Sequence, residues 1–97
     1  MIFPQNIKVG AHNIRVKIVD HENIEDFGEY NHYTRLIRLK EDNGIPEDAM
    51  AECFLHELFE VLDKLNNLNL NHVALTVLSE GIFQIIRDNK LDFRKSK

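Results

Sequence analysis

The sequence predicts an α+β fold, in which a small antiparallel or mixed sheet of about four strands packs on a two-helix hairpin. Apolar residues recur with a period of about two before Pro46 and with a period of three to four after it. The chain has 97 residues, 43% of them hydrophobic and 29% charged, which suits one globular core and is too short for two. We therefore expect one domain over residues 1–97.

The sheet is expected in about 6–40. Polar and apolar residues alternate on both sides of a turn at 10–13, which predicts a β-hairpin over about 6–20. Two further strands are expected at 28–30 and 35–39, joined by a turn at 31–34, and a turn at 41–44 closes this part of the chain.

The helices are expected at about 46–65 and 71–89. Proline followed by Glu47 and Asp48 suits a first helical turn, and Asn71 is a suitable N-cap for the second helix. The short connection between them predicts an antiparallel hairpin, with the first helix between the sheet and the second helix. The tail over about 90–97 is expected to be frayed.

Composition excludes several classes of function. Twelve Lys and Arg against sixteen Asp and Glu give a net charge of −4, which disfavours binding to nucleic acid. The single cysteine excludes an intrachain disulfide and a cysteine-rich zinc site. Apolar runs are too short to span a membrane, and the N-terminus does not have the pattern of a signal peptide. We expect a cytoplasmic domain.

The candidate chemistry lies in the first helix, in the segment HELFE at 56–60. His56 and Glu60 are four residues apart and leave one face of a helix, a spacing that suits two ligands of one Zn²⁺ ion. Glu57 is placed to act as a general base on a metal-bound water, as in zinc peptidases with the H-E-x-x-H motif. The alternative is that Glu57 and Glu60 lie at a solvent-facing edge of the helix.

A third ligand has to come from outside this segment. His72, at the start of the second helix, should lie beside the end of the first helix, and we favour it because an imidazole complements a carboxylate that already replaces one histidine. Glu80 is the competitor, because strict antiparallel pairing places it level with His56 and places Ser79 beside Leu58. The expected set is His56, Glu60 and His72, with water as the fourth ligand.

Five segments, in this order, resemble one family: GEY (28–30), TRLIRL (34–39), FLHELFE (54–60), LNH (70–72) and LSEGIFQIIRDN (78–89). The sequence is similar to small phage and prophage zincin-like proteins, distant relatives of the ImmA/IrrE-type metallopeptidases, over about 6–89. The resemblance implies a minimal zincin-like fold, one zinc ion and peptide hydrolysis in a bacterial host. It also implies that an edge strand, here 35–40, receives the substrate as an added strand.

Glu60 stands where the usual motif has histidine, and this HExxE variant leaves two other hypotheses open. In one, the chain is a non-catalytic phage accessory module that binds a protein partner or forms a homo-oligomer through Phe83 and Ile86. In the other, a metal pins the helical hairpin structurally. For catalysis, Tyr30, Tyr33 and His32 are candidates to stabilise an oxyanion.

Overall fold

Four strands and two helices follow one another in the described residues, 3–20, 27–41 and 46–91, of the computed structural model. They are β1 (Asn6–Val9), β2 (His12–Asp20), β3 (Gly28–Asn31), β4 (Leu36–Glu41), α1 (Glu47–Asn66) and α2 (His72–Asn89). The predicted α+β fold is confirmed, and each element begins and ends within about two residues of its expected bounds. The expected turn after residue 41 and the tail after residue 91 lie outside the described residues.

The sheet is mixed, with the strand order β1-β2-β4-β3. The β1–β2 and β3–β4 pairs are antiparallel, whereas β2 and β4 run parallel from Arg15 and Leu36 to Asp20 and Glu41. The expectation that 35–40 forms an edge strand is therefore wrong. β4 forms hydrogen-bonded ladders on both of its sides, and β3 ends the sheet instead.

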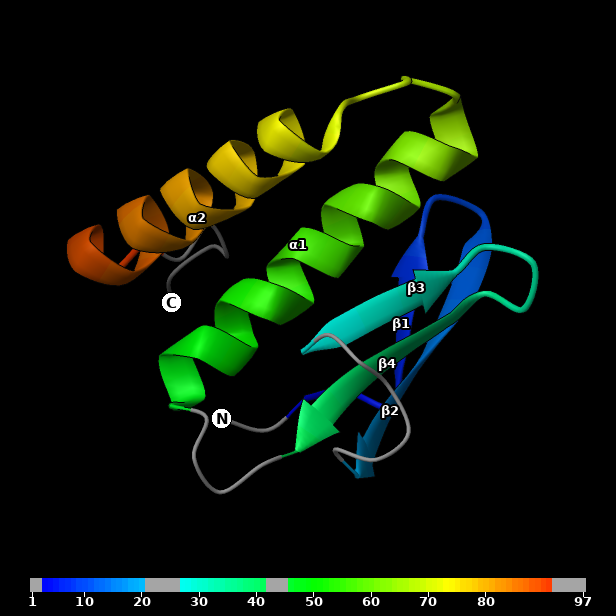
Figure 1. Cartoon of the computed structure of the whole chain (residues 1–97), viewed down its shortest axis with the longest axis horizontal. Helices are drawn as coiled ribbons and strands as arrows, with labels where there is room; N and C mark the ends of the chain where they lie inside the picture. Colours follow the sequence, from blue (N-terminus) through cyan, green and yellow to red (C-terminus); the bar gives the residue numbers. More distant parts are fainter. Residues whose placement is uncertain (1–2, 21–26, 42–45, 92–97) are drawn as a thin grey trace, which may run out of the picture.

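Helix α1 lies between the sheet and α2, as predicted (Figure 1). The core is made by side chains of three elements: Ile14 and Val16 of β2, Ile37 and Leu39 of β4, and Val61 of α1. Helix α2 contacts the other side of α1. No described helix is long and apolar enough to cross a membrane.

The connection between the helices is fixed on the end of α1 by Asp63, which is only 5% exposed. Its carboxylate accepts a hydrogen bond of 3.0 Å from the backbone N–H of Leu70, and its backbone carbonyl accepts one of 3.1 Å from Leu68. Asn71 then caps α2, because its side chain accepts a 2.7 Å hydrogen bond from the N–H of Ala74, which confirms the predicted N-cap. These contacts hold the first turn of α2 against α1.

Candidate functional site

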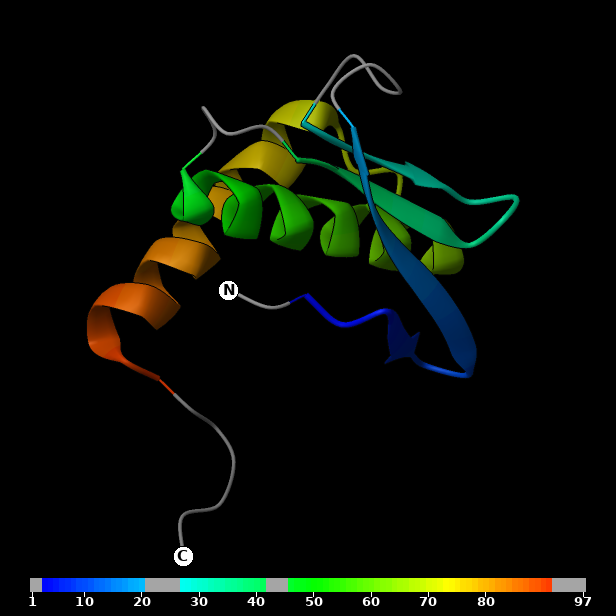
Figure 2. The ribbon, with the colours of Figure 1, turned by 90° about the horizontal axis from the view of Figure 1, so that it is seen from below.

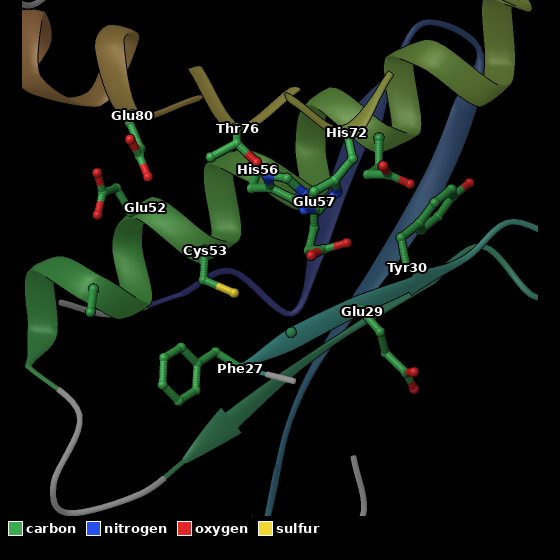
Figure 3. A pocket seen from close by; sticks show the side chains of 13 residues that line it. Phe27, Glu29, Tyr30, Glu52, Cys53, His56, Glu57, His72, Thr76 and Glu80 are labelled. Carbon is green, nitrogen blue, oxygen red and sulfur yellow. The ribbon is translucent and has the colours of Figure 1, made fainter. Parts of the chain in front are cut away.

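A pocket of about 600 Å³ lies between β3, α1 and the first half of α2 (Figure 3). The pocket is lined by the predicted general base and by all the candidate metal ligands: His56, Glu57, Glu60, His72 and Glu80. The strand that borders the pocket is β3, through Gly28, Glu29 and Tyr30. The structure therefore gathers the predicted residues around one cavity, although under a different strand from the one expected.

Two histidines from different helices meet in this pocket. The rings of His56 and His72 lie edge to face, with their centroids 5.2 Å apart. Burial lowers the pKa of His56, and the nearby His72 adds to this effect, while the carboxylates of Glu60 and Glu80 oppose it. The folded protein therefore favours the neutral imidazole of His56, the form that has a lone pair for a metal ion.

Ser79 contacts His56 from α2. The Ser79 hydroxyl is buried and donates a 3.1 Å hydrogen bond to the carbonyl of Thr76. Its oxygen lies 3.4 Å from Nδ1 of His56. Because the single hydroxyl proton is used on Thr76, the oxygen can only accept from Nδ1–H, which leaves the lone pair of His56 on Nε2. The sequence placed Ser79 beside Leu58, so this contact was missed, although Ser79 lies two helical turns after His72 on the same face of α2.

Glu57 is buried on α1, with 6% of its surface exposed. Figure 3 shows its carboxylate pointing from α1 toward β3. The alternative in which Glu57 faces solvent at the edge of the helix is therefore wrong, whereas Glu60 is half-buried. Glu57 is held inside the pocket, where an acid or base could act on a bound molecule.

Gly28 brings β3 close to α1. A Cβ atom at this position would lie 2.6 Å from Sγ of Cys53 and 3.1 Å from a methyl group of Leu39. A side chain here would force one of these groups to move, so glycine permits the close approach of strand and helix. Cys53 is half-buried and packs against the core.

Tyr30 lines the pocket, whereas Tyr33 is 96% exposed. The hydroxyl of Tyr30 lies 3.0 Å from Nδ1 of His32, and the guanidinium of Arg35 lies 3.1 Å from the same nitrogen. Burial raises the pKa of Tyr30, although the charge and hydrogen bond of Arg35 oppose the rise. The hydroxyl is therefore protonated at neutral pH. It donates to Nδ1 of His32, because a nitrogen that accepts from Arg35 carries no proton of its own. Of the three oxyanion candidates, Tyr30 has the most suitable position.

The donors around the pocket are of the kinds that zinc accepts, namely imidazole nitrogens and carboxylate oxygens. Within the part of the chain that the structure describes, no three His, Cys, Asp or Glu side chains already form a group that could hold a metal ion. His56 and His72 nevertheless adjoin, and the charges of Glu60 and Glu80 both act on His56. The types of donor side chain that line the pocket therefore suit a zinc ion.

Comparison with protein-family models, curated proteins and solved structures finds no match for the chain. The resemblance to zincin-like phage proteins thus stays a prediction from the sequence.

Proposed function

We propose that the chain is a zinc-dependent metallopeptidase-like domain in which His56, Glu60 and His72 hold one Zn²⁺ ion. The observation that carries the proposal is the contact between the His56 and His72 rings in a pocket that also contains the buried Glu57. The resemblance to phage and prophage zincin-like proteins supports the same assignment, with the cytoplasm of a bacterial host as its location.

Each residue has a distinct task in this proposal. His56 would present Nε2, because Ser79 lies at Nδ1. His72 and Glu60 would complete the ligand set, with Glu80 as the alternative third ligand. Bound zinc supplies Lewis acidity, which polarises a peptide carbonyl and acidifies water. The Glu57 carboxylate accepts a proton from the attacking water and returns it to the leaving amine.

The substrate approaches along β3 in this proposal. β3 is the last strand of the described sheet on the side of the pocket, so an extended peptide can add to its outer edge through backbone hydrogen bonds. Tyr30 on this strand would turn its hydroxyl proton from Nδ1 of His32 to the oxyanion that forms as the carbonyl is attacked. The expected substrate is therefore a peptide or an unfolded protein segment.

Zinc content tests the metal site. Protein purified without added zinc should contain close to one equivalent by elemental analysis, and His56→Ala should lose it. The matched control is His12→Ala, which removes an exposed imidazole from β2 and should keep the metal. Wild-type protein without bound zinc, or a zinc content unchanged by His56→Ala, would overturn the proposal.

Glu57→Gln separates catalysis from a structural metal, the second candidate. An ion held by His56 on α1 and His72 on α2 would pin the two helices together, which favours a structural role. Catalysis predicts that Glu57→Gln keeps its zinc but no longer cleaves a pool of unstructured peptides, monitored by mass spectrometry. A structural site predicts no cleavage by the wild type, and a lower Tm when zinc is chelated.

A further inference from the structure

One side of α2 carries large aliphatic side chains that α1 leaves uncovered. Leu75, Leu78, Ile82 and Ile85 form a row, here called the α2 seam, with spacings of three, four and three residues. Leu75 is buried where the seam meets α1, but Leu78, Ile82 and Ile85 are 44%, 37% and 45% exposed. Figure 2 shows the C-terminal half of α2 diverging from α1. Such spacing is the pattern by which one helix packs along another.

The four side chains of the α2 seam carry no charge. The residues beside it on the side away from α1 are Ala74 and Gly81, and small neighbours allow another helix to come close. α2 has three charged side chains. Glu80 lines the pocket, and Arg87 pairs with Asp48 of α1 at 3.2 Å. Asp88 follows Ile85 by three residues at the C-terminal end of the seam, where it pairs with Arg87 at 2.9 Å. A partner can therefore cover the seam from Leu75 to Ile82 without burying an ionised group, and beside Ile85 it meets Asp88, whose charge Arg87 balances.

We propose that the α2 seam is the interface of a homodimer, in which α2 packs antiparallel against α2 of a second copy. The spacings of three, four and three residues are the same in either direction along the helix. Two seams related by a two-fold axis therefore present matching positions to each other. Leu78 then faces Ile82 of the second copy, and Leu75 lies level with Ile85 of the second copy. The absence of charge in the seam means that two copies meet there without repulsion, despite the net charge of −4 on each.

The size of the seam sets the strength of the dimer. Helix α2 has 18 residues and is about 27 Å long. Two such helices in contact along one side bury an area near or below the roughly 1,200 Å² at which stable interfaces begin. The dimer is therefore in exchange with the monomer and depends on concentration. It also leaves the pocket open, because Leu78 and Glu80 are about 200° apart around the helix.

Sedimentation velocity over a wide range of protein concentration tests the interface. Wild-type protein should pass from monomer to dimer, and Ile82→Glu should weaken the dimer by at least about tenfold, as expected for a central interface residue. Val77→Glu is the matched control, because Val77 is 62% exposed on a different side of the same helix, and it should dimerise like the wild type. Circular dichroism checks that each variant is folded, and Ile85→Glu replaces Ile82→Glu if that variant is not.

A mixing experiment tests the antiparallel register. Leu78→Lys and Ile82→Glu should each be monomeric alone and should form a heterodimer when mixed, because the antiparallel arrangement brings the new lysine opposite the new glutamate. A wild-type protein that is monomeric at every concentration overturns the proposal, as does a dimer that Ile82→Glu leaves intact. A mixture that stays monomeric overturns the antiparallel pairing.

Discussion

Helices α1 and α2 distribute polar and apolar side chains in opposite ways. α1 buries two acids, Glu57 and Asp63, whereas α2 buries only Leu75 and Ser79 among its described residues and exposes a series of aliphatic side chains. Burying a carboxylate and exposing a row of large aliphatic side chains are both unfavourable for an isolated domain. Each departure therefore has to be explained from the groups that the side chain contacts.

The two acids of α1 show how to distinguish these causes. Asp63 accepts the N–H of Leu70 and thereby orders the connection to α2, so the fold itself accounts for its burial. Glu57 points into the pocket beside His56 and below β3 (Figure 3). Burial alone does not identify a functional acid; the group that the acid faces decides the matter.

Asp63→Ala should have the largest effect on stability. Its carboxylate makes a buried hydrogen bond to a backbone N–H, and loss of a hydrogen bond to a charged group costs about 1.5–3 kcal/mol of unfolding free energy. Urea unfolding with zinc chelated measures the change. Asp48→Ala is the control at the other end of α1, where the acid forms an exposed ion pair with Arg87, and its unfolding free energy should be almost unchanged. Equal effects in the two variants would contradict the structural role given to Asp63.

Ser79→Ala tests the polar residue that α2 buries against α1. Loss of a hydroxyl that orients a ligating histidine should weaken zinc binding by about tenfold, measured by competition with a chelator. Nitrogen NMR of the metal-free protein gives an independent measurement. The wild type should have its His56 proton on Nδ1, and the variant should shift toward a mixture of tautomers. A wild-type proton on Nε2 would contradict the role of Ser79.

The elements of this fold could be predicted because their signals are local. Pro46 and Asn71 mark helix starts, and the polar and apolar alternation around Gly10 marks a hairpin. The order of the strands could not be predicted, because the parallel pairing of β2 with β4 joins distant segments and leaves no local signature. The edge position expected for 35–40 came from the family resemblance, and the pairing of β4 with both β2 and β3 contradicts it.

The candidate site shows the same limit. The spacing of His56 and Glu60 is visible in the sequence, and the proximity of His72 follows from the short connection between the helices. Strict antiparallel pairing of the two helices, however, predicts that Ser79 lies beside Leu58, whereas in the structure the Ser79 hydroxyl lies at Nδ1 of His56. The approach of Gly28 to Cys53 depends on how the sheet lies over α1, which no spacing within one element reveals.

Two glycine substitutions compare the side of α1 that β3 covers with the side of α2 that no described residue covers. Gly28→Ala should lower the free energy of unfolding by about 1 kcal/mol, because its methyl group meets Sγ of Cys53. Gly81→Ala should raise it by about 0.5–1 kcal/mol, since nothing lies within 4 Å of the new Cβ and alanine is the better helix former. Thermal unfolding at low protein concentration measures both. In a Cys53→Ala background, Gly28→Ala should lower the free energy of unfolding much less. An equal loss in both backgrounds would mean that contact with Cys53 is not its cause.

The smallest effect expected is a change in how stability depends on pH where α1 and α2 meet. Burial and the neighbouring His72 lower the pKa of His56 in the metal-free fold, while an unfolded histidine has a pKa of about 6.5. Below pH ~6.5 the unfolded chain binds the proton more readily, so this contribution to stability is present above that pH and is lost as the pH falls through the folded pKa. His56→Gln should therefore reduce the decline in stability on acidification.

The matched variant His12→Gln removes an exposed imidazole from β2. If the free energy of unfolding depends on pH differently in His56→Gln than in His12→Gln, the difference comes from the histidine between α1 and α2. Urea unfolding at a series of pH values, with zinc chelated, measures both slopes. If the stability contributed by His56 rose on acidification instead, the carboxylates of Glu60 and Glu80 would outweigh burial, and the folded protein would prefer the charged imidazole. Such a preference would oppose zinc binding, because a ligating histidine has to be neutral. The sign of this small effect therefore bears directly on whether the two helices meet at a metal site.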